Sequence, residues 1–157
     1  LVNFCETLVV QRMGMPAQLC IYAETCGKGV AVEHDGGAYS CDHFVYPEYR
    51  LGNLRDRTLG EMVFDPVQVK FGYAKSETLP RYCRECDCLK DCWGECPKNR
   101  FIRTPDGEPG LNYLCGGWKR FFSHADGRIQ KIVRSLGEPV VKEVRIRASE
   151  HWQPARR

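Results

Sequence analysis

Apolar residues recur at helical spacing near both ends of the chain. In the first segment this pattern predicts a helix over residues 2–13 with one apolar face, on which Cys5 is expected as a buried, unreactive thiol. An approximate helical period from Phe121 to Leu136 predicts a second helix. No stretch approaches the roughly 18 consecutive apolar residues of a membrane span. The pattern therefore indicates a globular chain with a helix near each end.

The middle of the chain has the shorter apolar runs that are typical of β-strands. Residues 30–34 and 38–40 predict two strands joined by Asp35-Gly36-Gly37, a sequence common in tight hairpins because glycine readily adopts positive φ. Residues 42–53 contain proline and glycine and predict irregular structure. The hairpin is expected to bring Cys41, which follows its second strand, back toward the cysteines that precede it.

Short helices are predicted on both sides of the next cysteines. Thr58 and Glu61 have the spacing of a capping box, and Asp65-Pro66 has the pattern of an N-cap and first helical residue. Further along, residues 104–110 predict a turn-rich loop, and residues 111–115 predict the beginning of another helical stretch. Together these segments predict an α+β fold: a small domain with a short β-hairpin and several helices.

Cysteine is the unusual part of an otherwise ordinary composition. The chain has 157 residues, of which 43% are apolar and 27% charged, as expected for one globular domain. Ten residues are cysteine, and five of them lie within the fourteen residues from Cys83 to Cys96. Thiols grouped this closely hold soft metals, iron–sulfur clusters or disulfides.

The net charge of +3 is confined to the C-terminal segment. Residues 142–157 contain five basic and two acidic residues, which accounts for +3 and leaves 18 basic against 18 acidic residues in the remainder. A balanced body does not support a nucleic-acid interface. Basic residues nevertheless surround the cysteine-rich run, either as a solvated surface or as compensation for anionic, thiolate-ligated clusters. They are Arg81, Arg84, Lys90, Lys98, Arg100 and Arg103.

The first residues give an expectation about the cellular compartment. Residues 1–6 contain neither an initiator methionine nor the basic end of a signal peptide, so we expect a fragment of a longer, cytoplasmic protein. In a reducing compartment, grouped cysteines indicate metal or redox chemistry rather than structural disulfides.

The spacing of the cysteines suggests two sites. Cys83-x2-Cys86 is a step that lets two sulfur atoms face one metal, and Cys92-x3-Cys96-Pro resembles the end of the bacterial ferredoxin run, in which the last cysteine serves a different cluster from its neighbours. By this analogy, Cys96 joins three earlier cysteines, and a later cysteine completes the other set. The predicted sets are Cys20, Cys26, Cys41 and Cys96, and Cys83, Cys86, Cys92 and Cys115.

Three kinds of site remain open from the spacing alone. Disulfides are disfavoured by the expected compartment and by the close spacings. Two structural zinc sites would explain the Cys-x2-Cys pair in a small domain. Two iron–sulfur clusters would also explain the Cys-Pro ending and the crossing ligand. In either case Cys88, only two residues after Cys86, is predicted not to be a ligand, and neither is Cys5.

Several unusual strings resemble one family. The run Cys83-x2-Cys-x5-Cys-x3-Cys96, preceded by a Cys-x15-Gly-x4-Cys pattern and followed by Cys115, resembles the SPASM domain that follows the barrel of certain radical SAM enzymes. Cys41-Asp-His, residues 46–53, and the strings around Lys75, Arg100 and Leu111 are similar to the anaerobic sulfatase-maturating enzymes. The resemblance extends from about residue 19 to about residue 124.

The resemblance implies a function. In that family, two auxiliary [4Fe–4S] clusters are ligated entirely by protein, and a third cluster in a preceding barrel binds S-adenosylmethionine and generates a radical. The radical oxidises a Cys or Ser of an unfolded sulfatase polypeptide to Cα-formylglycine, with an electron donor protein as a further partner. The resemblance also implies that Asp42, in the Cys-Asp-His string, is the catalytic base. A zinc-stabilised structural or interaction module without redox activity is the alternative.

The same resemblance implies a domain organisation. Residues 1–18 are expected to link to an N-terminal barrel that this sequence lacks, because no CxxxCxxC motif is present. Residues 19–124 would form the two-cluster domain, residues 125–138 a C-terminal helix, and residues 139–157 a flexible basic tail. Without the barrel there is no site for S-adenosylmethionine, and this segment is expected to be inactive by itself.

Overall fold

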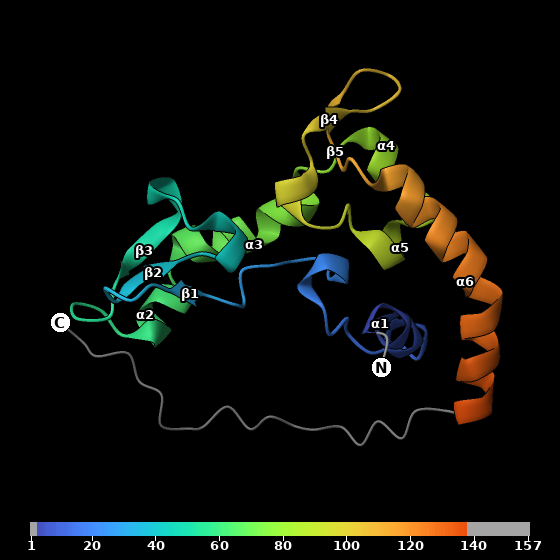
Figure 1. Ribbon diagram of the computed structural model, residues 1–157, viewed down its shortest axis with the longest axis horizontal. Coiled ribbons are helices and arrows are strands. Elements are labelled where there is room, and N and C mark those ends of the chain that lie inside the picture. Colours follow the sequence, from blue (N-terminus) through green and yellow to red (C-terminus); the bar gives the residue numbers. More distant parts are fainter. Residues whose placement is uncertain (1–2, 138–157) are drawn as a thin grey trace.

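The computed structural model describes residues 3–137, and the predicted tail over residues 139–157 lies outside this range. Short helices, 3₁₀ turns (η) and two small antiparallel sheets alternate along the chain (Figure 1). In chain order they are α1 (Asn3–Arg12), η1 (Cys20–Tyr22), β1 (Ala31–Val32), β2 (Gly37–Tyr39), η2 (Asp42–Phe44), η3 (Pro47–Tyr49), β3 (Arg50–Asn53), α2 (Leu59–Val63), α3 (Pro66–Glu77), α4 (Arg81–Arg84), α5 (Leu89–Cys92), η4 (Pro97–Asn99), β4 (Ile102–Arg103), β5 (Pro109–Leu111) and α6 (Cys115–Leu136). The predicted α+β class is confirmed.

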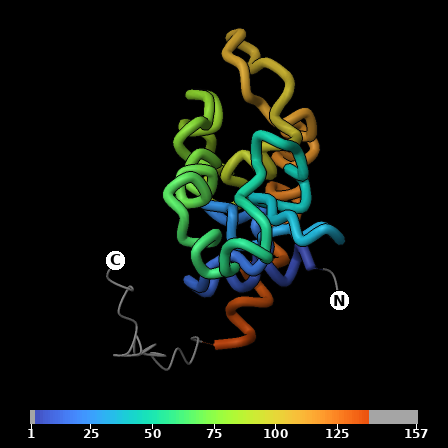
Figure 2. Tube along the Cα trace, turned by 90° about the vertical axis from the view of Figure 1, so that its left-hand side faces the viewer, coloured from blue at the N-terminus to red at the C-terminus, as the bar shows by residue number. Residues whose placement is uncertain are grey.

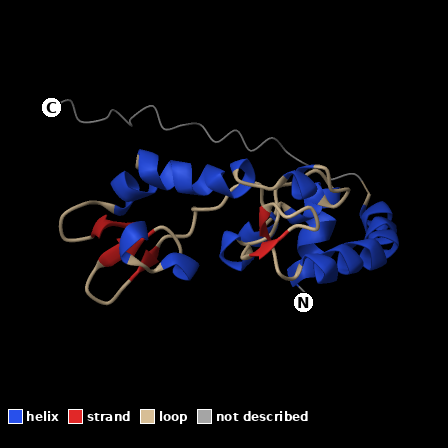
Figure 3. Ribbon diagram, turned by 90° about the horizontal axis from the view of Figure 1, so that it is seen from above, coloured by secondary structure: helices blue, strands red, loops and turns tan. Residues whose placement is uncertain are grey.

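The elements are distributed between two ends of an elongated molecule. Strands β1, β2 and β3 lie with α2 and α3 at one end, and α1 and α6 lie at the other (Figures 1 and 3). Between these ends, α3 leads from the sheet toward α4 and α5. The C-terminal end of α6 extends beyond the other described elements (Figure 2). Among the described residues, no helix is both long and apolar enough to cross a bilayer.

The predicted hairpin is present, but its sheet has a third strand. Strands β1 and β2 pair in register Ala31↔Tyr39, and Gly36, with φ of 84°, forms the turn between them. Strand β3 pairs with the other side of β2, with Ala38 opposite Gly52. The prediction of irregular structure over residues 42–53 was therefore wrong for β3. Two 3₁₀ turns fill the rest of that segment.

Two predictions near the C-terminus also require correction. Leu111 ends strand β5, which pairs with β4, so the predicted helical stretch does not begin there. Helix α6 begins at Cys115 and continues without a break to Leu136. The predicted boundary between residues 124 and 125 therefore lies inside one helix. The glycines at 116, 117 and 127 do not interrupt this helix, because its apolar face packs against the rest of the protein.

In the described part of the chain, the buried apolar residues form three small clusters and not one large core. The largest lies between α1 and α6, where Tyr22 is fully buried and its ring centroid lies 5.6 Å from that of Trp118 and 5.9 Å from that of Phe122. A second cluster lies under the three-stranded sheet around Met62. The third contains Cys83 with Leu79 and Leu111. Clusters this small bury little apolar surface, so a metal that crosslinks them would add substantially to stability.

Candidate metal centres

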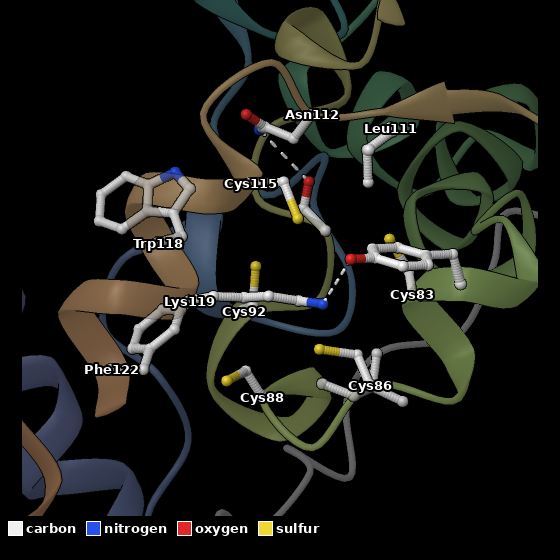
Figure 4. Close-up of a pocket in the computed structure, with 13 residues that line it drawn as sticks. Cys83, Cys86, Cys88, Cys92, Leu111, Asn112, Cys115, Trp118, Lys119 and Phe122 are labelled. Atoms are coloured by element: carbon white, nitrogen blue, oxygen red, sulfur yellow. Dashed lines mark hydrogen bonds between the residues drawn. The ribbon is translucent and has the colours of Figure 1, made fainter. Parts of the chain in front are cut away.

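Four of the predicted ligands meet in one cavity, which we call the Cys83 site: Cys83, Cys86, Cys92 and Cys115. Their sulfur atoms lie around a common space, together with that of Cys88 (Figure 4). The cavity wall is completed by aromatic and aliphatic side chains that include Trp118, Phe122 and Leu111. The structure thus brings together residues that are separated by up to 32 positions in the sequence.

Local turns aim these cysteines at the cavity. Cys83 lies in α4, and its carbonyl oxygen accepts a 3.1 Å hydrogen bond from the backbone N–H of Cys86, which closes a tight turn around the pair. Cys92 is the last residue of α5, and Cys115 is the first residue of α6. Ahead of α6, the side-chain oxygen of Asn112 accepts from the N–H of Leu114 at 2.8 Å and fixes the approach of Cys115.

Burial controls the protonation of these thiols. Burial, with smaller contributions from the nearby thiols of Cys115 and Cys83, raises the pKa of Cys92 to about 12. The pKa of Cys83 and that of Cys115 are also raised, chiefly by burial. Such thiols stay protonated at neutral pH unless a cation stabilises the thiolate, so metal uptake would have to release protons.

An unpaired donor tests which group fits the cavity. The Nε1 of Trp118 is buried and has no hydrogen-bond partner among the described residues. A buried N–H without an acceptor is costly, and cluster sulfur atoms accept such hydrogen bonds. Four thiols and an apolar wall that includes Trp118 therefore fit an iron–sulfur cluster. Cys83, Cys86, Cys92 and Cys115 would hold it.

Cys88 and Cys5 occupy different environments. Cys88 lines the same cavity as the four candidate ligands, and burial together with the neighbouring Cys86 raises its pKa. Cys5 packs against the apolar cluster between α1 and α6. That both are not ligands stays a prediction, and for Cys88 the position within the cavity makes its substitution an informative test.

The other four predicted ligands approach one another from four segments, and we call them the Cys41 site: Cys20, Cys26, Cys41 and Cys96. Burial raises the pKa of Cys26, and the charges of Cys20 and Cys96 add to this increase. Burial also raises the pKa of Cys41 to about 12, with a contribution from Cys20. Burial therefore keeps the thiols of Cys26 and Cys41 protonated at neutral pH unless a cation stabilises the thiolates.

A polar face of helix α3 holds the loop that carries Cys20 and Cys26. The Nε2 of Gln68 donates to the carbonyl oxygen of Gly27 at 2.6 Å, and the carbonyl oxygen of Gly72 accepts from the N–H of Cys26 at 3.2 Å. A Cβ at Gly72 would lie 2.6 Å from the carbonyl oxygen of Cys26, so only glycine permits this approach. Sequence reasoning missed this face because its buried residues are polar; the spacing of residues 68, 72 and 75 is the one signal that could have indicated it.

Asp42 and His43 lie directly beside this site. The Sγ of Cys41 donates to Oδ1 of Asp42 at 3.0 Å, which holds the pKa of Asp42 below its ordinary value. The Nδ1 of His43 lies 3.2 Å from the Sγ of Cys96. One donor atom from each of Cys41, Asp42 and His43 lies within 4.8 Å of the others. Asp42 is exposed, so a bound substrate could reach its carboxylate.

A left-handed turn directs Cys92 and Cys96 to different sites. Three consecutive residues, Trp93, Gly94 and Glu95, have positive φ angles of 45°, 67° and 55°. In a continued helix, residues four apart would share one face. The reversed turn separates them, so one thiol joins the Cys83 site and the other turns toward the Cys41 site. This turn would provide the physical basis of the crossing pattern that the ferredoxin analogy predicts.

Substituting Gly94 should disrupt both sites. A Cβ at this position would lie 2.4 Å from Cδ2 of Leu79 and 2.7 Å from Nη2 of Arg100, in addition to the strain of a positive φ. We therefore expect Gly94→Ala to lower the melting temperature by several degrees more than Gly107→Ala. Gly107 is the matched control, because its φ is also positive, at 89°, but no heavy atom lies within 4 Å of a Cβ there. Equal melting temperatures for the two variants would contradict the steric role of Gly94.

The basic residues around the cysteine-rich run have different environments. Arg81 forms an ion pair with Asp106 at 2.9 Å, and Lys98 lies 4.2 Å from the ring centroid of Tyr46. Arg100 is partly buried, and its guanidinium group donates only to backbone carbonyls. The others are exposed: Arg84, Lys90 and Arg103. Arg100 alone in this group has the environment expected of a cation that compensates buried thiolates.

Comparisons with known proteins show what the chain is similar to. Residues 20–87 match SPASM, an iron–sulfur cluster-binding domain. A serine-type anaerobic sulfatase-maturating enzyme of Bacteroides thetaiotaomicron is 49% identical over 123 residues, which are 78% of this chain and 30% of that protein. A cysteine-type enzyme of Clostridium perfringens is 32% identical over 112 residues, 71% of this chain and 30% of its own length. The chain therefore spans about 30% of the length of these relatives.

A solved structure is also similar. Native anSMEcpe with bound AdoMet and Kp18Cys peptide gives a TM-score of 0.72 at 28% identity, and the match covers 85% of this chain and 36% of that one. A serine-type relative from Klebsiella pneumoniae is 38% identical over 117 residues, 74% of this chain and 28% of its own length. The resemblance found in the sequence is confirmed: the chain contains a SPASM iron–sulfur domain and is similar to the C-terminal part of the anaerobic sulfatase-maturating enzymes.

Proposed function

We propose that this chain is the auxiliary-cluster and substrate-binding part of a radical SAM oxidoreductase that converts a Cys or Ser of a sulfatase to Cα-formylglycine. The observation that carries the proposal is the Cys83 site, where four cysteines from distant segments line one cavity. Support also comes from relatives named for this activity and from a similar structure that holds both AdoMet and a peptide.

Two [4Fe–4S] clusters are the proposed cofactors of this chain. One would be held by Cys83, Cys86, Cys92 and Cys115, and the other by Cys20, Cys26, Cys41 and Cys96. S-adenosylmethionine and a third cluster would belong to a radical SAM barrel outside these residues, so this segment alone would not complete the reaction. The proposed partners are that barrel, an unfolded sulfatase polypeptide and an electron donor protein, in the cytoplasm.

The proposed role of Asp42 follows from the balance of the reaction. Oxidising a C–OH or C–SH group to a double bond removes two hydrogen nuclei and two electrons. One hydrogen atom would pass to a radical supplied by the barrel outside these residues, one proton would pass from the side chain to Asp42, and one electron would leave. With a cysteine substrate, hydrolysis of the resulting C=S group would then give the aldehyde and release sulfide. A bound cluster supplies an acceptor for that electron. When Cys41 binds metal it no longer gives a proton to Asp42, which leaves Oδ1 free to take one from the substrate.

A zinc-stabilised module is the second candidate, and one observation favours it. The donor atoms of Cys41, Asp42 and His43, within 4.8 Å of one another, form a mixed sulfur, oxygen and nitrogen set that also suits zinc. Such a chain would be colourless and without redox activity.

Metal analysis of the anaerobically purified chain distinguishes these functions. We expect a brown protein with about eight iron atoms and about eight sulfides per chain, as two [4Fe–4S] clusters require. Visible absorption and iron, sulfide and zinc determinations provide the readout. A colourless protein that contains zinc in place of iron would refute the proposed function and support the alternative.

A further inference from the structure

Two cationic side chains, those of Lys75 and Arg100, bind backbone segments that carry cysteines of the two groups. Lys75, near the C-terminal end of α3, is 1% exposed. Its Nζ donates to the carbonyl oxygens of Cys20, at 2.6 Å, and Ile21, at 3.0 Å, and also to that of Ala23. Two of these acceptors lie in η1, which begins with a cysteine of the Cys41 site, and Ala23 follows η1 directly. All of the hydrogen bonds recorded for the ammonium group go to this segment.

Arg100 binds the segment that joins the two sites. Its Nη2 donates to the carbonyl oxygen of Trp93 at 2.6 Å and to that of Glu95 at 3.1 Å, and its Nε donates to that of Gly94 at 3.0 Å. One guanidinium therefore holds all three carbonyls of the left-handed turn between Cys92 and Cys96. Its Nη1 donates to the carbonyl oxygen of Lys75 at 2.6 Å, so the two cationic residues are also bound to each other.

Neither cation has a carboxylate partner within the described part of the chain, since the buried carboxylate of Glu95 accepts from the side-chain amides of Asn99 and Asn112 instead. The ion pairs there involve Arg12, Arg57 and Arg81. Burial, and then the charge of Arg100, lower the pKa of Lys75 to about 8. The thiols of Cys26, Cys20 and Cys92 act in the opposite direction. The hydrogen bonds link both groups to these cations: Lys75 binds the carbonyl of Cys20, and Arg100 binds the turn between Cys92 and Cys96.

A buried ammonium group and a partly buried guanidinium group without carboxylate partners are costly unless a nearby anion compensates them. Carbonyl oxygens solvate an ammonium or guanidinium group but do not neutralise it. A [4Fe–4S] cluster with four thiolates is such an anion, and it becomes more negative when reduced. The charge that the protein places here thus matches the charge that the proposed clusters would bring.

We infer that Lys75 and Arg100 are shared positioning residues for both metal sites: a buried and a partly buried counter-charge, held by carbonyls alone, that raise the reduction potentials of both clusters together. The inference rests on the proposed function, because it requires two clusters. A cation near a cluster stabilises the reduced, more negative state, so removing it shifts the potential to a more negative value. Since Lys75 lies within electrostatic reach of both sites, one substitution should shift both potentials.

Redox titration of three lysine variants of the chain, followed by visible absorption and electron paramagnetic resonance, tests the inference. Lys75→Gln keeps an N–H donor for the loop carbonyls but removes the charge, whereas Lys75→Arg keeps the charge. Lys70→Gln is the matched control, because Lys70 lies on the same helix but is exposed. We expect two more negative midpoint potentials for Lys75→Gln at full iron content, and unchanged potentials for Lys75→Arg and Lys70→Gln.

Each other outcome has a definite meaning. Loss of iron from Lys75→Gln but not from Lys75→Arg would also support the inference, because assembly would then depend on the charge. Iron-replete Lys75→Gln with unchanged potentials, or with only one shifted potential, would overturn it. Equal loss of iron from both Lys75 variants would overturn it too, since side-chain shape would then be the cause. The iron content of the unsubstituted chain tests the proposed function separately, and a chain without iron would refute both.

Discussion

Replacing Cys115 by alanine should remove one cluster and leave the other, so that iron falls from about eight to about four atoms per chain. Cys115 contributes the thiol that α6 brings to the Cys83 site. The Cys41 site draws its cysteines from other segments and should keep its metal. Iron determination and the visible absorption of anaerobically purified Cys115→Ala measure the effect.

Two matched substitutions separate ligand loss from general damage. Cys88→Ser alters the same cavity, and Cys5→Ser alters the apolar cluster between α1 and α6. If neither residue is a ligand, both variants should retain the full iron content. Unchanged iron in Cys115→Ala would remove that residue from the proposed set. Loss of iron in Cys88→Ser would show that the fifth thiol in the cavity coordinates metal.

Elements that depend on neighbouring residues could be predicted from the sequence. The capping box is present, because the N–H of Glu61 donates to Oγ1 of Thr58 at 3.3 Å and the N–H of Thr58 donates to Oε2 of Glu61 at 2.8 Å. Asp65 caps α3 by accepting from the N–H of Val67 at 2.9 Å. These contacts span two or three residues, so their sequence signals are local.

Strand β3 could not be predicted in the same way. It contains Gly52 and Asn53, which disfavour strands, and it is held in place by its pairing with β2 and the burial of Leu51. Just before the strand, the N–H of Ser40 donates to the carbonyl oxygen of Tyr49 at 3.0 Å. These interactions join segments about ten or more residues apart, and no local pattern reports them.

Helix α3 shows a second limit of sequence patterns. An amphipathic helix is expected to bury its apolar residues, yet Val67 is 66% exposed and Lys75 is 1% exposed. The buried face of α3 donates hydrogen bonds to backbone carbonyls of the loop that carries Cys20. Every residue has a backbone carbonyl, so the sequence of that loop does not indicate the interaction. The grouping of the cysteines depended less on such details, because their number and spacing already suggested two sets of four.

Replacing Asp42 by asparagine should nearly abolish formylglycine formation while leaving the metal sites intact. Asparagine has the size of aspartate but cannot take a proton from the substrate, and the loss of a general base lowers rates by at least about 100-fold. Asp42 is exposed and lies beside Cys41 rather than within the apolar clusters, so its substitution should not disturb folding.

The test of Asp42 requires the longer enzyme that contains a radical SAM barrel together with this chain. Asp42→Asn should retain the iron content of the unsubstituted enzyme and still cleave S-adenosylmethionine, yet produce little formylglycine peptide by mass spectrometry. Asp56→Asn is the control, because Asp56 is an exposed carboxylate in the turn that follows β3 and should support normal product formation. Near-normal product from Asp42→Asn would remove this residue from the mechanism. Loss of iron together with product would instead identify Asp42 as a support for the Cys41 site, since its carboxylate lies only 3.0 Å from the sulfur of Cys41.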